Sequence, residues 1–238
     1  MKIVVYTHSD YSWVWKYWHQ QTDKFLKNFE KICLLNSNSS FRNDYQIITY
    51  DDQINYKNRV LSCLDKINDE EIILFCHEDM FLYEKPNFGI LNEYIKLIKN
   101  DNCGLIKLIR AFEDLEKSNL HEKLFKNPEK QLFSIQPSLT KVKTLKYIYK
   151  TVPGNNIWEF EANTTKEYLK DLVSLCSYDF NIDKKRGKFH YDSSVYPYIC
   201  TAVIKGKWNF KEYKKELYEI FYNKKFNIFS YYFSKLRF

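Results

Sequence analysis

Short apolar runs alternate with longer segments of helical periodicity through the first half of the chain. The apolar runs have the length of buried strands and lie at 2–7, 31–37, 45–50, 71–76 and 103–109. The segments between them repeat apolar residues at helical spacing and lie at 12–29, 54–67 and 88–100. This alternation predicts an α/β fold in which a Rossmann-like, mainly parallel twisted sheet is flanked by helices.

The second half of the chain has a less regular pattern. We expect, in chain order, a strand at 131–138, a helix at 139–150, a helical segment at 168–175, a β-like region at 188–208 and a last helix at 211–222. A length of 238 residues suits one domain, because single hydrophobic cores stop growing at roughly 250 to 300 residues. We therefore expect a single domain over 1–238.

Composition narrows the choice of partner and compartment. The formal net charge of +7 is interleaved with acidic residues, which favours an anionic ligand and argues against a nucleic-acid partner. The 6 cysteines stand singly, without a CxxC pair, as reduced core residues do. The first apolar run is too short for a signal peptide, and none approaches the ~20 residues of a membrane span. We expect a cytoplasmic protein.

The C-terminal segment FNIFSYYFSKLRF, at 226–238, combines basic and aromatic residues. This composition is typical of an interfacial membrane anchor. Terminal segments of this kind also pack back onto the core, which is the reading the sequence favours. Peripheral membrane contact through the tail stays open as the alternative.

Polar side chains end the apolar run at 71–76. His77, Glu78 and Asp79 follow it directly, and ligands bind outside the carboxyl ends of strands in such sheets. Carboxylates there are ligands that Mg²⁺ or Mn²⁺ prefers when the ion also holds diphosphate oxygens. The alternative is a solvated strand end. His190 is a candidate third metal ligand, or else a packed histidine.

Two glutamates, Glu159 and Glu161, alternate with aromatic residues at the start of a predicted helix. A carboxylate beside aromatic rings is partly desolvated, which raises its pKa and suits it to taking a proton from a hydroxyl. Glutamate is also favoured at a helix start by the macrodipole. The sequence offers a candidate general base here and leaves open which glutamate it is.

The end of the first strand carries small polar residues that suit contact with a base or ribose, namely Thr7, His8, Ser9 and Asp10. Asp10 is otherwise an ordinary acid at a helix start. The chain contains no glycine-rich phosphate loop, which argues against a dinucleotide fingerprint or a P-loop. Arg59 and Lys185 are candidate cations for a nucleotide diphosphate, with a solvated surface as the alternative.

The order of these segments resembles a known family. It runs KIVVYTHSDY, NRVLSCLDKINDEEIILFCHEDMFL, LFSIQPSLTKVKTL, NIWEFE and YICTAVIKGKWN, from about residue 2 to about residue 210. The chain resembles the small bacterial and giant-virus sugar transferases of capsule, lipopolysaccharide and glycan synthesis, a branch of the A-type glycosyltransferase fold. The resemblance implies a donor-binding half at 1–110, an acceptor and catalytic half at 111–210, and a C-terminal helix and tail at 211–238.

The resemblance also implies roles for single residues. The strand tip would hold a metal and the donor diphosphate, with Asp79 as the best-placed ligand and Glu78 next. The family motif is Asp-x-Asp, and His77 replaces its first aspartate, which puts dependence on Mn²⁺ or Mg²⁺ in question. Glu159 or Glu161 would be the base. The THSD loop would meet the nucleotide, with uridine as the favoured nucleoside, and the residues on the acceptor side would be Gln136, Asn156 and Trp158.

We therefore expect a glycosyltransferase of the hexosyl or deoxyhexosyl class. It would transfer a sugar, with inversion, from a nucleoside-diphosphate sugar to a hydroxyl of a glycan or lipid-linked acceptor. One alternative is a nucleotidyltransferase that uses the same acidic strand tip. The other is an inactive carbohydrate-binding or sugar-nucleotide-binding module, which the altered His-Glu-Asp motif favours.

Overall fold

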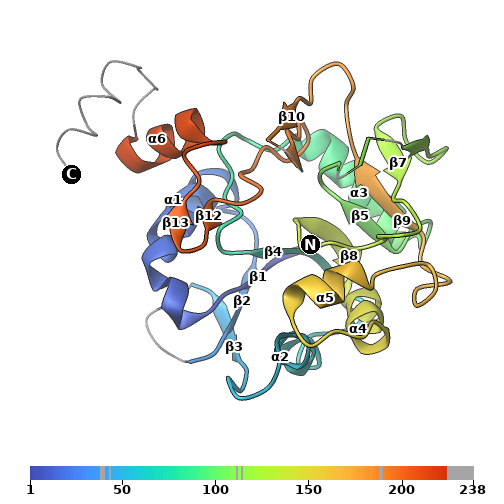
Figure 1. Cartoon of the computed structure of the whole chain (residues 1–238), viewed down its shortest axis with the longest axis horizontal. Helices are drawn as coiled ribbons and strands as arrows, with labels where there is room; N and C mark the ends of the chain where they lie inside the picture. Colours follow the sequence, from blue (N-terminus) through green and yellow to red (C-terminus); the bar gives the residue numbers. More distant parts are fainter. Residues whose placement is uncertain (38–40, 43, 111, 114, 188–189, 224–238) are drawn as a thin grey trace.

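The computed structural model describes residues 1–223 except 38–40, 43, 111, 114, 188 and 189 (Figure 1). The predictions for the tail at 226–238 concern residues outside this description. None of the helices in the described ranges is long and apolar enough to cross a membrane.

The first half follows the predicted order of strands and helices. Its elements are β1 (Lys2–Tyr6), the 3-10 helix η1 (Ser9–Tyr11), α1 (Ser12–Phe25), β2 (Lys31–Leu35), β3 (Gln46–Thr49), α2 (Tyr56–Leu64), β4 (Ile72–His77), α3 (Phe88–Lys99) and β5 (Leu105–Lys107). Asparagine side chains cap α2 and α3, where Asn55 and Asn87 accept hydrogen bonds from backbone N–H groups three residues on. These caps explain where the two helices begin.

The second half departs from the prediction at several places. Its elements are β6 (Glu116–Lys117), β7 (Leu124–Lys126), β8 (Ser138–Lys141), α4 (Val142–Thr151), α5 (Ile157–Ala162), β9 (Ser174–Ser177), β10 (Lys185–Arg186), β11 (His190–Tyr191), β12 (Val203–Ile204), β13 (Lys207–Trp208) and α6 (Lys214–Tyr222). The helix expected at 168–175 is wrong, because Ser174–Ser177 is a buried strand. The strand expected at 131–138 is also wrong over most of its length, since β8 begins at Ser138.

One sheet of the described residues connects both halves, in the order β3-β2-β1-β4-β8-β5-β9-β7-β6. Strands β3, β2, β1 and β4 are parallel neighbours. Strand β8 is antiparallel to both β4 and β5, so β5 runs in the same direction as β4. The predicted α/β architecture is confirmed, with its parallel part in the first half and mixed pairing in the second.

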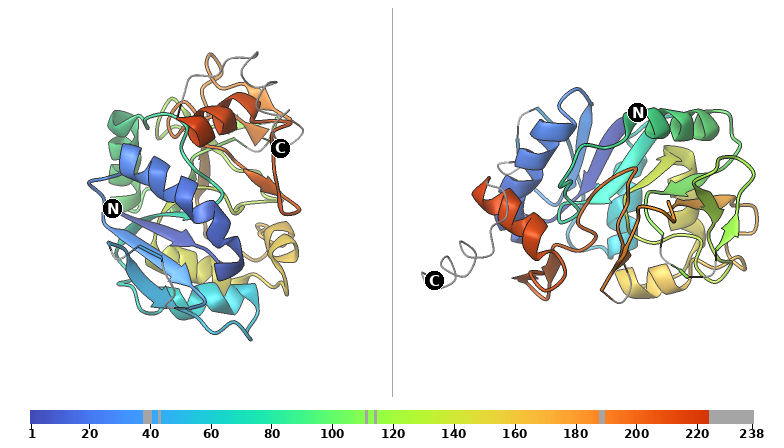
Figure 2. Two further views of the ribbon diagram at one scale, coloured as in Figure 1. Left: turned by 90° about the vertical axis from the view of Figure 1, so that its left-hand side faces the viewer. Right: turned by 90° about the horizontal axis from the view of Figure 1, so that it is seen from above.

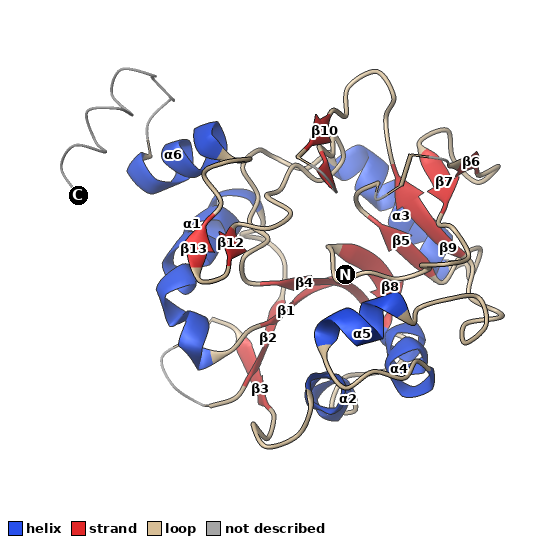
Figure 3. Cartoon of the chain, viewed as in Figure 1, coloured by secondary structure: helices blue, strands red, loops and turns tan. Residues whose placement is uncertain are grey.

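Helices cover both faces of the sheet (Figures 2 and 3). Helices α1 and α3 lie on one face, and α2 packs against α4 on the other. The central strands are therefore shielded on both sides, and the side chains of Ile3, Val5 and Leu74 are fully buried. Continuous apolar strands are what a sheet covered on both faces requires.

The carboxyl ends of β1 and β4 meet at one edge of the sheet, since Tyr6 pairs with His77. After β4 the chain runs beside the segment at 195–202. The amide of Ile199 donates to the Phe81 carbonyl at 2.9 Å, and the amide of Ala202 donates to the Asp79 carbonyl at 3.3 Å. These bonds bring the short β12–β13 hairpin next to the strand tip.

Candidate active site

A cavity of about 600 Å³ lies at this edge of the sheet. Its walls come from the end of β1 and the following η1, helix α2, the tip of β4, the turn before α5 with the first residues of α5, and the β12–β13 hairpin. Its lining residues are Tyr6, His8, Tyr11, Tyr56, Arg59, His77, Glu78, Asp79, Asn155, Asn156, Ile157, Trp158, Val203, Lys205 and Gly206. The predicted strand tip and the predicted WEFE segment thus reach the same cavity.

The loop after β1 is held by a polar network. The His8 ring accepts a hydrogen bond from the Asp10 amide through Nδ1, so Nε2 carries the proton and donates to the Asp52 carboxylate at 3.0 Å. Arg59 pairs with the same carboxylate at 3.0 Å, and Asn36 donates to it at 3.3 Å. The first cause of the lowered pKa of Asp52 is its hydrogen bond with His8. Asp52 therefore anchors His8 and Arg59, two of the predicted donor-binding residues that line the cavity.

The other three residues of the first loop do not line the cavity. Thr7 is fully buried, and its hydroxyl accepts a hydrogen bond from the Trp15 indole at 2.8 Å. Ser9 binds Asn36 through both its amide and its hydroxyl. Asp10 is exposed. Within the THSD loop, His8 is the residue that reaches the cavity.

At the tip of β4, His77 is engaged by a tyrosine. Its Nε2 lies 3.1 Å from the Tyr56 hydroxyl, which lies 2.9 Å from the Tyr149 hydroxyl. Burial lowers the pKa of His77 to about 3, so the imidazole is neutral at physiological pH. A neutral ring bound to Tyr56 does not replace the charge of the aspartate found in the Asp-x-Asp motif.

The two carboxyls that follow are adjacent and both line the cavity. Burial, and then the neighbouring Asp79, raise the pKa of Glu78 well above its ordinary value. Burial raises the pKa of Asp79 to about 6, although the backbone amides of Val203 and Ala202 oppose the shift. The base of the hairpin thus lies beside Asp79, whose carbonyl accepts from the Ala202 amide. Placing two carboxyls together in a partly dehydrated cavity favours a cation between them.

The donor set for a divalent metal is incomplete by itself. The described residues contain no group of three or more His, Cys, Asp or Glu side chains that could hold a metal. Mg²⁺ commonly uses one or two carboxylates and takes its other ligands from substrate phosphates and water. Glu78 and Asp79 fit an ion that arrives together with a diphosphate, and they do not form a site that is complete without one.

The two glutamates of α5 differ in surroundings. Asn156 caps the helix by accepting from the amides of Trp158 and Glu159. Glu159 is exposed, and its Oε2 accepts from the Asn155 amide at 3.0 Å, as an acid at a helix start often does. Trp158 is 77% exposed while lining the cavity, so much of its surface is accessible to a ligand.

Glu161 lies on the inner side of α5. Its Oε1 accepts a hydrogen bond from the Ile135 amide. Burial raises its pKa, and the Ile135 amide and the Lys107 ammonium oppose that rise. Its charge contributes to the raised pKa of Tyr56, which lines the cavity, and to that of Tyr149. Glu161 does not itself line the cavity.

Three other predicted site residues lie away from the cavity lining. Gln136 accepts a hydrogen bond from the Tyr198 hydroxyl at 2.7 Å. Lys185 forms an ion pair with Glu113. The Nδ1 of His190 lies 3.7 Å from a Glu212 oxygen, and His190 does not line the cavity that Asp79 lines.

Sequence reasoning missed several residues of the site. Asn36 and Asp52 follow β2 and β3, and their positions after neighbouring strands were a usable signal. Lys205 and Gly206 form the turn between β12 and β13, where the glycine is a turn signal but the lysine is not. Tyr56 carried no such signal, because a tyrosine at a helix start is most often a packing residue.

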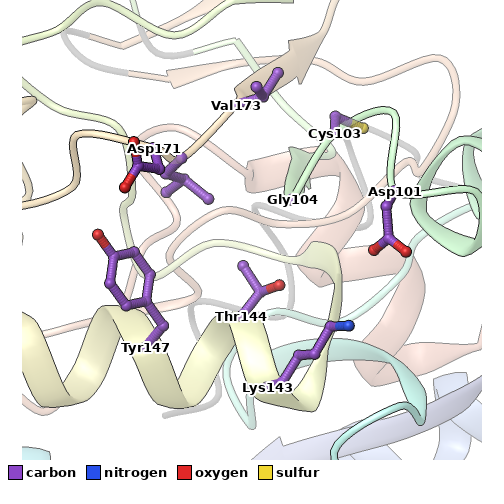
Figure 4. Close-up of a pocket in the computed structure, with 9 residues that line it drawn as sticks. Asp101, Cys103, Gly104, Lys143, Thr144, Tyr147, Asp171 and Val173 are labelled. Carbon is purple, nitrogen blue, oxygen red and sulfur yellow. The ribbon is translucent and has the colours of Figure 1, made fainter.

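A second hollow of about 490 Å³ lies at the opposite edge of the sheet (Figure 4). One wall of this hollow is formed by α4, through Lys143, Thr144 and Tyr147. The facing wall is formed by the segments around Gly104 and Val173, which precede β5 and β9. It lies at the amino ends of these strands, whereas ligands of open α/β sheets bind outside the carboxyl ends. The cavity at the strand tip is therefore the candidate active site.

Among known proteins, the chain is similar to solved structures only. No protein-family model matches the sequence, and no curated protein matches it. The S. aureus TarS 1–349 structure in complex with UDP is 15% identical, covers 80% of this chain and 60% of its own, and has a TM-score of 0.48. The galactosyltransferase LgtC with donor and acceptor sugar analogues is 11% identical, covers 74% and 67%, and has a TM-score of 0.41.

A third similar structure is the bifunctional IspDF from Campylobacter jejuni, which is 15% identical, with coverage of 73% of this chain and 55% of its own and a TM-score of 0.38. This chain spans less than two thirds of the TarS and IspDF chains. The fold and the site define an α/β protein with a mixed sheet. Its polar cavity lies where strands β1 and β4 end, and it is lined by the carboxyl groups of Glu78 and Asp79.

Proposed function

We propose that the protein is a glycosyltransferase of the A-type fold that transfers a sugar from a nucleoside-diphosphate sugar to an acceptor hydroxyl. The observation that carries this proposal is the convergence of the carboxyls of Glu78 and Asp79 and the exposed ring of Trp158 on one cavity. Carboxylates suit an activated donor, and aromatic faces pack against the apolar faces of sugars. A glycan or lipid-linked chain is the acceptor class that we propose.

The nucleoside part of the donor would lie beside His8, Arg59 and Asp52. Their hydrogen bonds fix polar groups at the wall of the cavity before any ligand binds, which is how small-molecule sites obtain specificity. Because one similar structure is described as a complex with UDP and another as a complex with UDP-GlcNAc, uridine nucleotides are the first to test.

The diphosphate would lie against Asp79 and Glu78. These carboxylates would hold Mn²⁺ or Mg²⁺ together with the diphosphate, and such an ion would stabilise the negative charge of the leaving group. His190, predicted as a further ligand, is not needed for this arrangement. The altered motif makes metal dependence a question for experiment.

Glu161 is the residue that we propose as the general base. In the transfer, the acceptor oxygen forms a bond to the anomeric carbon while the bond from that carbon to the diphosphate oxygen breaks. The acceptor proton passes to the Glu161 carboxylate, and the nucleoside diphosphate leaves with the electron pair. Since Glu161 does not itself line the cavity, we infer that one water connects it to the acceptor hydroxyl, which is within the reach of a general base.

The matched variants Glu161→Gln and Glu159→Gln test this assignment. Both lie on α5, but Glu159 is exposed and holds the Asn155 amide. We expect Glu161→Gln to lower kcat at least 10²-fold with little change in donor affinity, and Glu159→Gln to retain most activity. Because burial raises the pKa of Glu161, the pKa that describes the acid limb of the wild-type pH–rate profile should be higher than the ordinary pKa of a glutamate.

The assay measures release of nucleoside diphosphate and mass of the product from sugar nucleotides supplied with and without Mn²⁺ and acceptor glycans. Equal activity of the two variants would remove Glu161 from the mechanism. A product that carries the nucleotide would indicate a nucleotidyltransferase instead. Donor binding without turnover would support an inactive sugar-nucleotide-binding module, the second candidate that the neutral, tyrosine-bound His77 favours.

A further inference from the structure

We propose that Lys205, at the tip of the β12–β13 hairpin, binds the diphosphate of the donor. This inference rests on the proposed function and names the cation that its donor site requires. Lys205 lines the cavity together with Glu78, Asp79 and Arg59, although it lies 126 residues after Asp79 in the chain. The predicted cation Lys185 is paired with Glu113 instead and does not line the cavity.

The hairpin is built to hold a side chain at its tip. Val203 pairs with Trp208, and Ile204 pairs with Lys207, which leaves a turn of two residues. Lys205 and Gly206 have φ values of 51° and 73°, and positive φ at both positions is what a type I′ turn requires. A lysine is rarely found in this conformation, so the turn itself does not account for a lysine at this position.

The base of the hairpin is anchored while its tip is open. The Trp208 ring contacts Trp13 on α1 at 4.8 Å between centroids and Phe221 on α6 at 4.7 Å. The Asn209 amide donates to the Ala202 carbonyl at 2.8 Å. At the tip, a Cβ built on Gly206 would have nothing within 4 Å. The tip can therefore accept a ligand without disturbing the core.

Lys205 is also the cavity cation that carries no acidic partner. Asp52 engages both His8 and Arg59. Lys205 has no ion pair or hydrogen bond in the part of the chain that the structure describes, and its side chain is exposed. The neighbouring carboxyls would repel a diphosphate, so binding needs a compensating charge that is not already used. The ammonium of Lys205, with three donors, fits this need.

The test compares Lys205→Asn with Lys207→Asn. Asparagine tolerates positive φ better than other side chains, so the turn should persist when the charge is removed. Lys207 is equally exposed on the same hairpin and does not line the cavity. Calorimetry would measure binding of uridine, UMP and UDP, and of the matching guanosine and thymidine series, to each variant with and without Mn²⁺.

We expect Lys205→Asn to bind the preferred nucleoside diphosphate at least about tenfold more weakly than the wild type, with the nucleoside itself unaffected, because contacts to a charged group are strong. Lys207→Asn should bind as the wild type does, and Lys205→Arg should retain most of the affinity. Unchanged affinity of Lys205→Asn for the diphosphate would overturn this inference alone. Equal weakening for nucleoside and diphosphate would overturn the assignment to the diphosphate. Absence of nucleotide binding to the wild type would overturn the proposed function as well.

Discussion

Lys107 lies at the end of β5 with its side chain fully buried and its ammonium without a hydrogen-bond partner among the described residues. Burial lowers the pKa of this lysine from its ordinary value, and the charge of Glu161 acts in the opposite direction. The same interaction opposes the rise that burial causes in the pKa of Glu161. A buried charge of this kind destabilises the fold. Lys107 also favours the ionised form of Glu161, because it opposes the effect of burial on that carboxyl.

We predict that Lys107→Met stabilises the protein at neutral pH by roughly 1–3 kcal/mol, because it removes an unsatisfied buried donor and keeps the side-chain shape. For a chain of this length, each kcal/mol of added stability raises the Tm by about 2–4 °C. Thermal unfolding followed by circular dichroism measures it. The same variant should lower transferase activity if Lys107 keeps Glu161 ionised.

The pH dependence of this effect has a definite sign. Burial of Lys107 lowers its pKa in the folded state below the unfolded value of 10.5. At pH values below the folded pKa the lysine is charged in both states, and its burial destabilises the folded protein by the full amount. This destabilisation disappears as the pH rises past 10.5, where the lysine is neutral in both states. The advantage of Lys107→Met should therefore shrink towards pH 10.5. Lys141→Met on the neighbouring strand is the control, since Lys141 is paired with Asp101 at 2.7 Å and its loss should lower Tm. A lower Tm of Lys107→Met than of wild type would contradict the prediction.

At the level of elements, the turn before α5 depends on a close backbone approach. A Cβ built on Gly154 would lie 2.6 Å from the amide nitrogen of Phe160 and 2.7 Å from its Cα. The ring of Phe160 is fully buried and lies 4.5 Å from that of Tyr149. Glycine thus lets the turn that carries Asn155 and Asn156 lie directly on α5 and line the cavity.

We predict that Gly154→Ala lowers stability by about 1–3 kcal/mol, because the added methyl group overlaps backbone atoms that cannot move independently of α5. It should also reduce activity more than its effect on stability explains, since the turn and Trp158 would shift together. Differential scanning fluorimetry and steady-state kinetics below the melting range separate the two effects. Wild-type kinetics in this variant would show that the position of the turn is unimportant.

The first-half elements follow from the sequence because local and tertiary signals agree there. The apolar runs of β1, β2 and β4 are continuous, as strands buried on both faces must be, and the helices between them repeat apolar residues at helical spacing. At 168–175 the signals conflict. Leu169, Leu172 and Leu175 have helical spacing, but pairing of Ser174–Ser177 with both β5 and β7 makes the end of this stretch a strand.

Some residues of the candidate site could likewise be predicted from the sequence, and others could not. The strand tip was predictable, since polar residues directly after a buried run lie on the ligand edge whatever the rest of the fold does. Lys205 was not, because its place depends on long-range bonds such as the one between Ala202 and Asp79. The difference between Glu159 and Glu161 was not predictable either, because the partner of Glu161 is the amide of Ile135 in a distant loop.

At the level of the whole molecule, one sheet connects the two halves proposed from the sequence. The junction includes the antiparallel pairing of β4 with β8, from Ile72 with Lys141 to Phe75 with Ser138, and the pairing of β5 with β8 and β9. The segment that follows β4 is also bound to the chain near residue 200. The cavity is assembled from both sides of this junction, so the two halves share a core and the site depends on their pairing.

We therefore predict that the chain unfolds in one cooperative transition. Tryptophan fluorescence is weighted towards the first half, where Trp15 and Trp18 are buried, whereas far-ultraviolet circular dichroism reports all helices and strands. The two probes should give coincident midpoints, because neither half can keep its central strands covered after β4 separates from β8. A fragment ending at residue 110 should fail to fold for the same reason, since it would expose the β4 edge and the fully buried Phe75 ring. Two separate transitions, or a folded fragment that binds UDP, would show that the donor half is independent and that the acceptor half is docked onto it rather than built into the same sheet.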